Sequence, residues 1–328
     1  MKNRLPEWIS EHLVLPVITA PMFLVSNPQL VISACKSGVI GSFPSLNART
    51  VDDLRAWMST ITEELARSRA AEPDRKIAPW AINIVIRHLN ERLEEELELI
   101  KKYQPPFVFT ALGDPAPVVE IVHAYGGIVF SDVTNIYHAK KAVKSGVDGL
   151  ILVCGGAGGH AGTLNSFAFL SAIREFWDGI TVLAGGIASG QEILAARTID
   201  ADLVFMGTRF IASVESSAGD DYKQMLIDAS IEDIIYTPTF SGIPANYLKP
   251  SIVGEGLDPD HLGTYAEFAK TGRKAWKNIW SAGHGVGRTK SIQTVAEIVN
   301  ELQTEYDQTL AAFKQLPASR SPLNSSLN

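Results

Sequence analysis

The chain has 328 residues, of which 46% are hydrophobic and 20% charged, as in a globular protein with one large or two smaller domains. A net charge of −7 without basic runs argues against nucleic-acid binding, and no apolar stretch approaches the roughly 18 residues of a membrane span. With only Cys35 and Cys154 and no apolar signal segment at the N-terminus, a reducing cytoplasm is expected rather than secretion.

Apolar runs alternate with amphipathic segments through the first 210 residues. The runs end near Ala20, Phe43, Ile84, Thr110, Ser131, Cys154, Gly185 and Gly207. Segments with helical spacing of apolar residues are Val51–Ala70, Leu89–Tyr103, Asn135–Ser145 and Gln191–Thr198. Alternation at intervals of about 20 to 40 residues is typical of parallel βαβ units. Eight such units predict an α/β fold, a (β/α)8 TIM barrel; a doubly wound open sheet is the alternative, because periodicity does not show closure.

The alternation stops after Phe210. We expect helices over Ala218–Ser230 and Leu262–Trp280, a turn-rich segment over Thr237–Lys249, and a long helix over Ser291–Lys314. This third of the chain is too irregular for a second barrel, so we interpret it as an excursion over the barrel mouth followed by a closing helix. The expected parts are a barrel core (1–210), an irregular and helical substrate-side insertion (211–290), a closing C-terminal helix (291–315) and a disordered tail (316–328).

The densest glycine cluster follows the sixth apolar run. Residues 155–162 read Gly-Gly-Ala-Gly-Gly-His-Ala-Gly, and His160 is the only ionisable side chain among them. Glycines let a large group approach the main chain closely, and a flat cofactor ring beside one imidazole suits this composition. Histidine ordinarily has a pKa of about 6.5, so an imidazole here can bind or release a proton at neutral pH. A flexible loop is the alternative, although a predicted strand leads directly into the cluster.

Two further glycine turns follow the seventh and eighth runs. Gly185 and Gly186 come after the first of these runs, and Gly207 and Thr208 come after the second. In (β/α)8 barrels the loops after strands seven and eight commonly bind a phosphate through main-chain N–H groups. The Thr208 hydroxyl can add another donor. We therefore predict a phosphate site here, with a pair of ordinary tight turns as the alternative.

Other candidate residues lie at the carboxyl ends of predicted strands. Pro21 and Met22 follow the first strand and offer a stiff, apolar surface for a ring. Asn83, late in the third strand, has a donor and an acceptor for a heterocycle edge, with an ordinary buried hydrogen bond as the alternative. Asp132 ends the fifth strand, where capping the next helix is the favoured role. Cys154 ends the sixth strand, and because no basic residue is beside it in sequence, an inert thiol is favoured over a nucleophile.

Several common site patterns are weak or missing. Residues 156–161 fit the dinucleotide pattern Gly-x-Gly-x-x-Gly/Ala, but Glu175 and Asp178 precede the next strand instead of ending it. The sequence has no Gly-x-x-x-x-Gly-Lys-Ser/Thr loop, which argues against a nucleotide triphosphatase. The other histidines lack metal-ligand spacing, so no metal site is predicted. No Ser-His-Asp arrangement can be recognised.

From about Leu15 to Glu305 the chain resembles the nitronate monooxygenase family, formerly called 2-nitropropane dioxygenases. Five motifs occur in the family's order: Ala20-Pro21-Met22, Gly158-Gly159-His160-Ala161-Gly162, Ala184-Gly185-Gly186-Ile187, Met206-Gly207-Thr208-Arg209-Phe210 and Trp280-Ser281-Ala282-Gly283-His284-Gly285-Val286-Gly287. Two positions depart from the pattern. His284 stands where many relatives have glutamine, and Cys154 stands where relatives often have a polar amide or another residue that touches the flavin.

The resemblance implies an FMN-dependent (β/α)8-barrel enzyme. Its expected reaction is the oxidation of alkyl nitronates, such as propionate 3-nitronate, by dioxygen to carbonyl compounds and nitrite, without reduced nicotinamide. His160 is the expected catalytic residue, which would orient the nitronate or take the carbon-bound proton of a neutral nitroalkane. The residues expected to bind FMN are Ala20, Pro21, Met22, Asn83, Asp132, Cys154, Gly155, Gly159, Gly185, Gly186, Met206, Gly207 and Thr208.

Alternative functions stay open at this point. The same family includes flavin-dependent enoyl-acyl-carrier-protein reductases and NAD(P)H:quinone reductases, so an FMN-dependent reductase is the first alternative. The second is a flavin-free barrel that binds a phosphorylated metabolite with Cys154 as nucleophile, and the third is a non-catalytic flavin-binding protein. The expected partners are a small-molecule substrate and dioxygen, without nucleic acid or membrane, for a cytoplasmic monomer or homodimer.

Overall fold

Eight parallel strands form the main sheet of the protein. The computed structural model describes residues 2, 4–86, 90–273 and 275–315. Within these residues the strand order is β1-β9-β8-β6-β5-β4-β3-β2, and a parallel bridge between Ile18 and Ile40 joins the two ends of the sheet. The predicted (β/α)8 barrel is therefore confirmed. The doubly wound alternative is wrong, because an open sheet would leave β1 and β2 as unpaired edges.

The barrel strands end within two residues of the predicted positions. Their bounds are β1 (Val17–Thr19), β2 (Gly41–Pro44), β3 (Trp80–Val85), β4 (Phe107–Ala111), β5 (Ile128–Val133), β6 (Gly149–Val153), β8 (Ile180–Ala184) and β9 (Leu203–Met206). Most of their residues are buried on both faces of the sheet, as is typical of parallel strands covered by helices. This double burial explains why the strands read as continuous apolar runs.

Helices follow the strands and cover the outside of the barrel. They are α2 (Pro28–Lys36), α3 (Val51–Ala71), α4 (Leu93–Tyr103), α5 (Ala116–His123), α6 (Ile136–Lys144), α7 (Ser166–Arg174), α8 (Gly190–Thr198) and the short α9 (Thr208–Ile211), with a 3-10 turn, η1, at Ser45–Asn47. Side-chain caps set several starts: Thr50 forms a capping box with Asp53 before α3, and Ser189 accepts a bond from the Glu192 amide before α8. Leu89, the first residue of the predicted helix Leu89–Tyr103, lies outside the described residues.

The amino-terminal end of the barrel is closed by the short helix α1 (Glu7–Ser10). Ile9 on this helix is fully buried and belongs to the same cluster as the barrel-interior residues Phe107, Phe109 and Phe130. Phe109 and Phe130 stack with their ring centroids 5.7 Å apart, a favourable aromatic geometry. Because this end is filled with apolar side chains, the open end of the barrel is the one at which the strands terminate.

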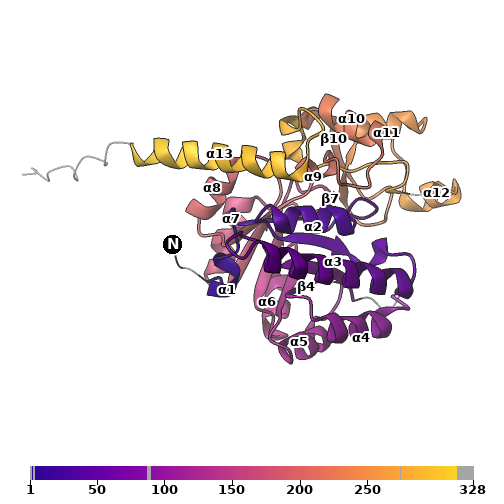
Figure 1. Ribbon diagram of the computed structural model, residues 1–328. Coiled ribbons are helices and arrows are strands. Elements are labelled where there is room, and N and C mark those ends of the chain that lie inside the picture. Colours follow the sequence, from indigo (N-terminus) through magenta and orange to yellow (C-terminus); the bar gives the residue numbers. More distant parts are fainter. Residues whose placement is uncertain (1, 3, 87–89, 274, 316–328) are drawn as a thin grey trace, which may run out of the picture.

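A large insertion separates α9 from the last helix, α13 (Val295–Lys314). It contains α10 (Asp220–Asp228), η2 (Ile231–Asp233), β10 (Ile234–Thr237), β11 (Ala245–Leu248), α11 (Lys249–Gly254), α12 (Tyr265–Lys270) and η3 (His284–Arg288). Figure 1 shows these elements gathered on one side of the molecule, whereas α13 runs beside α8. Contacts of α13 with α8 and α2 complete the outer ring of helices.

The insertion is hydrogen-bonded to a loop of the barrel. The loop after β6 contributes a two-residue strand, β7 (Gly159–His160), which pairs antiparallel with β11 in the sheet β10-β11-β7. The glycine cluster predicted from the sequence is therefore joined directly to the insertion by main-chain pairing. This contact positions the insertion over one part of the barrel mouth.

One predicted helix is wrong in length. Of the stretch Leu262–Trp280 only α12, Tyr265–Lys270, is helical. Gly272 has φ +72° and Trp276 has φ +70°, and a right-handed helix cannot continue through left-handed backbone. The predicted disordered tail, residues 316–328, lies outside the described residues. The division of the chain at residues 210, 290 and 315 stays a prediction.

Candidate active site

The glycine loops after β6, β8 and β9 lie close together at the open end of the barrel. Parallel strands place all their carboxyl ends at one rim, and the spacing here is tight. A Cβ atom built on Gly185 would lie 2.9 Å from the Gly155 carbonyl oxygen, and one built on Gly207 would lie 3.5 Å from Met22 Sδ and 3.6 Å from Ala20 Cβ. The main-chain N–H of Ala20 also donates to the Met206 carbonyl at 3.1 Å. The rim thus brings together the first, sixth, seventh and eighth strands of the barrel.

Gly186 leaves room beside its main chain. Its φ of +73° lies in the left-handed region that favours glycine. Apart from Gly186 and its two chain neighbours, no atom of the described residues lies within 4 Å of the position that a Cβ atom would take. Gly185, by contrast, is packed against the loop after β6, as described above. Gly185 therefore shapes the turn, and Gly186 is where a bound group could approach the main chain.

The C-terminal motif Trp280–Gly287 packs onto these loops. The amide of His284 donates to the Gly156 carbonyl at 2.9 Å, and the amide of Gly283 donates to Thr208 Oγ1 at 2.9 Å. A Cβ atom on Gly285 would lie 2.6 Å from Ala188 Cβ, so glycine is required where the motif meets the loop after β8. Thr208 accepts one bond through its oxygen, and its hydroxyl hydrogen can be donated to another acceptor.

Two polar side chains, Asn83 and Asp132, point toward the barrel interior. Asn83 lies two residues after Ala81 in β3, and Asp132 lies two residues after Phe130 in β5. Ala81 and Phe130 belong to the interior cluster, and alternate residues of a strand share a face. Among the described residues, Asn83 Nδ2 makes one long bond, of 3.4 Å, to the Phe109 carbonyl. Asp132 Oδ1 is inaccessible and has no hydrogen-bond partner among the described residues. Unsatisfied polar atoms at this place can bind a heterocycle edge.

The helix-capping interpretation of Asp132 is wrong. The N-cap of α6 is Asn135, whose side chain accepts a bond from the His138 amide. The Asp132 carboxyl is instead enclosed beneath the barrel mouth, although the residue as a whole is only half-buried. This enclosure raises the pKa of Asp132 to about 7, because loss of water disfavours the charged form.

Asp132→Asn is expected to make the stability of the ligand-free protein less sensitive to pH. The folded-state pKa lies above the unfolded value of 3.8, so the folded chain retains a proton that the unfolded chain releases, and wild-type stability falls as pH rises from about 4 to about 7. Because the residue as a whole is only half-buried, solvent screens part of this effect, and we expect the asparagine variant to gain about 2 kcal/mol relative to wild type between pH 4 and pH 8. Urea unfolding at several pH values measures this difference. Asp74→Asn, at an exposed position, is the control, and parallel pH curves for wild type and Asp132→Asn would contradict the expectation.

The thiol of Cys154 faces away from the barrel interior. It packs in the layer between sheet and helices, and its Sγ donates to the Leu152 carbonyl at 3.3 Å. Burial raises its pKa to about 12, so a thiolate nucleophile is disfavoured. Val153, one residue earlier, packs against the interior cluster instead. Contact between Cys154 and a cofactor stays a prediction.

His160 lies on β7, above the rim and against the insertion. Its partner in the ladder is Ala245 of β11, and its side chain is exposed. The ring Nε2 is 3.2 Å from Ser241 Oγ, and the ring meets Trp276 edge to face with centroids 5.4 Å apart. An exposed imidazole held by a hydroxyl and an aromatic ring can exchange a proton with a substrate that enters the mouth.

A sequence profile of the nitronate monooxygenase family matches residues 7–305, nearly the whole described chain. The chain belongs to the nitronate monooxygenase family. The protein is accordingly an enzyme, an oxidoreductase.

Individual relatives in this family are distant in sequence. The nitronate monooxygenase of Neurospora crassa is 24% identical over 92% of this chain and 92% of its own length. An octahydro-indene-carboxyl-CoA dehydrogenase of Rhodococcus jostii is 26% identical over 80% of this chain and 69% of its own length.

Solved structures share the fold. FabK of Thermotoga maritima superposes with a TM-score of 0.75 at 23% identity, covering 96% of this chain and 99% of that chain. The nitroalkane oxidase of Streptomyces ansochromogenes superposes with a TM-score of 0.76 at 22% identity, covering 92% of this chain and 99% of that chain. These likenesses concern the architecture of the barrel and its insertion.

Several residues around the mouth were not predicted as site residues for this nitronate monooxygenase family member. Ser241 and Trp276 contact His160. Asn246, buried on β11, donates from Nδ2 to the Ala157 carbonyl at 2.7 Å and so supports the glycine cluster from above. All three lie in the irregular insertion, where no local periodicity marks which side chains face the barrel.

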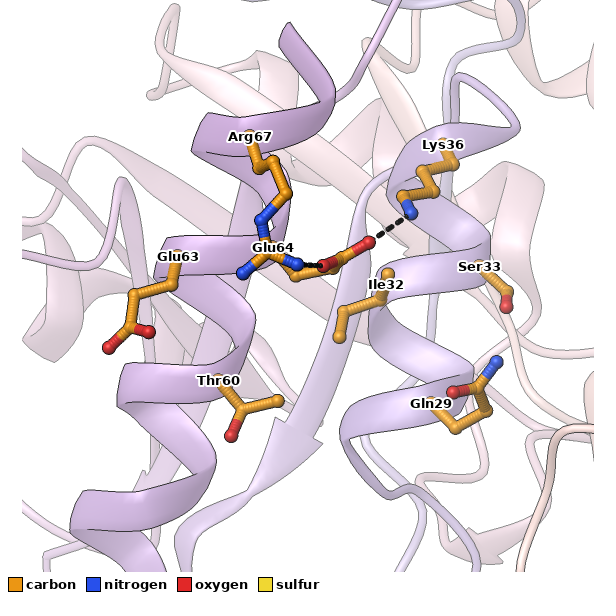
Figure 2. Close-up of a pocket in the computed structure, with 8 residues that line it drawn as sticks. All are labelled: Gln29, Ile32, Ser33, Lys36, Thr60, Glu63, Glu64 and Arg67. Carbon is orange, nitrogen blue, oxygen red and sulfur yellow. Dashed lines mark hydrogen bonds and ion pairs between the residues drawn. The ribbon is translucent and has the colours of Figure 1, made fainter. Parts of the chain in front are cut away.

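A pocket on the outer wall of the barrel is not part of this site. Figure 2 shows it between α2 and α3, with Lys36 and Arg67 on either side of Glu64. Lys36 Nζ lies 2.6 Å and Arg67 Nη1 lies 2.7 Å from the Glu64 carboxylate oxygens. Since these charges are paired with one another and no predicted site residue lines the pocket, the rim of the barrel remains the candidate site.

Proposed function

We propose that the protein is an FMN-dependent nitronate monooxygenase that oxidises alkyl nitronates, such as propionate 3-nitronate, with dioxygen to carbonyl compounds and nitrite. Membership in the nitronate monooxygenase family supports this reaction class. The structural observation on which the proposal depends is the rim, where Thr208 is bonded to Gly283 and Gly186 lies against Gly285 of the same motif, with the exposed His160 on the loop after β6.

The residues present fit a flavin mononucleotide. The open space at Gly186, together with the Gly207 and Thr208 main chain at the start of α9, suits a single phosphate group. Asn83 and the unpartnered Oδ1 of Asp132 suit the polar edge of a ring. When bound, FMN would supply the one-electron oxidation that amino-acid side chains cannot.

His160 is the proposed catalytic residue. For a nitronate, which is already an anion, the imidazolium form would bind and orient the negative charge. For a neutral nitroalkane, the neutral imidazole would take the proton from carbon, and the C–H electron pair would remain on the substrate to give the nitronate. The interior aromatic side chains below the mouth exclude water from the barrel.

In the part of the chain that the structure describes, no helix combines the length and the apolar character that a membrane span requires.

The visible spectrum of the purified enzyme and an anaerobic titration test this function. We expect a yellow protein that releases FMN, not FAD, on heat denaturation, and whose flavin absorbance is bleached by propionate 3-nitronate without dioxygen. Nitrite should then appear when dioxygen is admitted. Rapid bleaching by NADH or NADPH with no response to nitronate would favour the reductase alternative, and a protein that stays colourless after reconstitution with FMN would overturn the flavin site.

A further inference from the structure

The loop after β1 contains a leucine in an unfavourable backbone conformation. Leu24 has φ +63°, in the left-handed region where the Cβ atom of an L-residue lies too close to a carbonyl oxygen. A free loop would relax out of this conformation. Surrounding contacts must therefore hold Leu24 in place.

Asn47 makes such contacts from a neighbouring loop. It lies in η1, directly after β2, and its side chain is buried. Its Oδ1 accepts the amide hydrogen of Leu24 itself at 2.9 Å, and its Nδ2 donates to the Met22 carbonyl at 2.9 Å and to the Ser26 carbonyl at 2.7 Å. A side-chain amide nitrogen has two hydrogens, so both of them are bonded to this one loop.

The same contacts fix the main chain of Met22 from both sides. Its carbonyl accepts from Asn47, and its amide donates to Ser26 Oγ at 3.0 Å. The Met22 side chain reaches the rim, where its Sδ lies 3.5 Å from the position of a Cβ atom built on Gly207. It packs there against the layer between sheet and helices and against a cluster of the insertion. The place of Met22 at the barrel mouth therefore depends on Asn47.

The turn that carries Asn47 is itself anchored by charged side chains. Glu96 on α4 is fully buried, and its carboxylate accepts from Ser45 Oγ at 3.0 Å and from Arg92 Nη2 at 3.0 Å. Arg92 Nη1 also donates to the Ala48 carbonyl at 2.9 Å. Hydrogen bonds to ionised groups are stronger than neutral ones, so η1 gives Asn47 the rigid support that a positioning residue needs.

We propose that Asn47 is a positioning residue of the flavin site, which holds the loop after β1 in its left-handed turn and so keeps Met22 at the rim as an apolar surface for the flavin ring. The inference rests on the proposed function for the identity of the cofactor, and on the three hydrogen bonds for the hold on the loop. Because Asn47 stabilises the left-handed turn when the chain folds, the cofactor does not have to order this loop when it binds. Such preorganisation raises the affinity for a bound group.

Titration of the apoprotein with FMN, followed by flavin fluorescence, measures the effect. Asn47→Ala is expected to raise the dissociation constant about tenfold, as loss of one or two hydrogen bonds would. Met22→Ala should raise it as well, but the double variant should raise it by less than the product of the two separate factors, because both substitutions act through Met22. Thr294→Ala, which removes the capping box of α13, lowers stability elsewhere and should leave the dissociation constant unchanged. An unchanged constant in Asn47→Ala, or the full product in the double variant, overturns the proposal.

Leu24→Gly gives a second readout that a general loss of stability would not produce. Glycine adopts a φ of +63° without the penalty that leucine has. Added to Asn47→Ala, Leu24→Gly is therefore expected to lower the dissociation constant for FMN again, by about threefold. No recovery in this double variant would show that Asn47 does not act by holding the left-handed turn.

Hydrogen–deuterium exchange of the flavin-free protein separates this proposal from the proposed function. Relative to wild type, Asn47→Ala should exchange faster in the loop 20–27 and equally in the loop 154–165 after β6. If wild type binds no FMN while this local acceleration is seen, the proposed function fails and the hold of Asn47 on the loop stands. Exchange in the loop 20–27 that matches wild type overturns the positioning role, whatever the flavin result.

Discussion

His160→Asn is expected to lose most turnover of neutral nitroalkanes while the protein keeps its fold and its flavin. The side chain is exposed, and the β7–β11 pairing at this position is made by main-chain atoms, so the substitution leaves the ladder intact. An asparagine amide fills a similar space and can still donate a hydrogen bond, but it cannot take a proton from carbon. Removal of a general base typically slows a reaction by about 10² to 10⁴.

Comparison of the two substrate forms separates the possible roles of His160. Turnover of pre-ionised nitronate should fall less than turnover of the neutral nitroalkane, because the nitronate has already lost its carbon-bound proton. His261→Asn, at an exposed insertion histidine that pairs with Asp258, is the control for loss of an imidazole elsewhere. Wild-type rates for both forms would show that His160 is not catalytic. Equal loss for both forms, with flavin retained, would assign it to anion binding instead of proton removal.

Gly186→Val is expected to yield a folded protein that purifies largely without flavin. The valine methyl groups would occupy the space beside the main chain that the described residues, other than the chain neighbours of Gly186, leave open, and so block the phosphate from the rim. Loss of charge-assisted hydrogen bonds should cost about 3 kcal/mol or more, which corresponds to a dissociation constant raised about a hundredfold. Flavin content after purification and fluorescence titration of the apoprotein with FMN measure the effect.

The chain offers a closely matched control for this substitution. Gly256 has φ +72°, next to +73° at Gly186, and its Cβ position is likewise open among the described residues beyond its chain neighbours, but it lies just after α11 in the insertion. Gly256→Val therefore introduces the same backbone strain, on the order of 1–3 kcal/mol, without touching the rim. We expect Gly256→Val to retain full flavin content. Full flavin content in Gly186→Val as well would show that Gly186 only shapes a turn.

The positions of the barrel strands could be predicted because parallel strands buried on both faces have continuous apolar sequences, which end in polar or glycine-rich turns. Helix starts were marked by local chemistry, as at Ser189 before α8. The prediction failed over Leu262–Trp280, where residues with helical preference enter the left-handed backbone near Gly272 and Trp276. The helix ends just before Gly272, whose left-handed backbone is a local stop signal that the prediction passed over.

Only the tertiary structure decided on which face of the sheet each strand side chain lies. Because residues on both faces of β6 are apolar, the sequence did not show that Val153 faces the interior and Cys154 the surrounding helices. In the same way, the place of Asp132 at the end of a strand favoured a helix cap, whereas Asn135 caps α6 in the structure. Alternation gives the period of a strand but not which of its two faces is inside.

The amino-acid sequence by itself determined the barrel, its glycine turns and the family motifs, because each of these depends on residues that are neighbours along the chain. The tertiary structure alone decided that the Gly283 amide reaches Thr208, 75 residues away, and that Ser241 lies against His160, 81 residues away. Such contacts are formed when the insertion folds back onto the rim. A hydrogen bond between distant segments leaves no periodicity in either one, so only the folded chain reveals it.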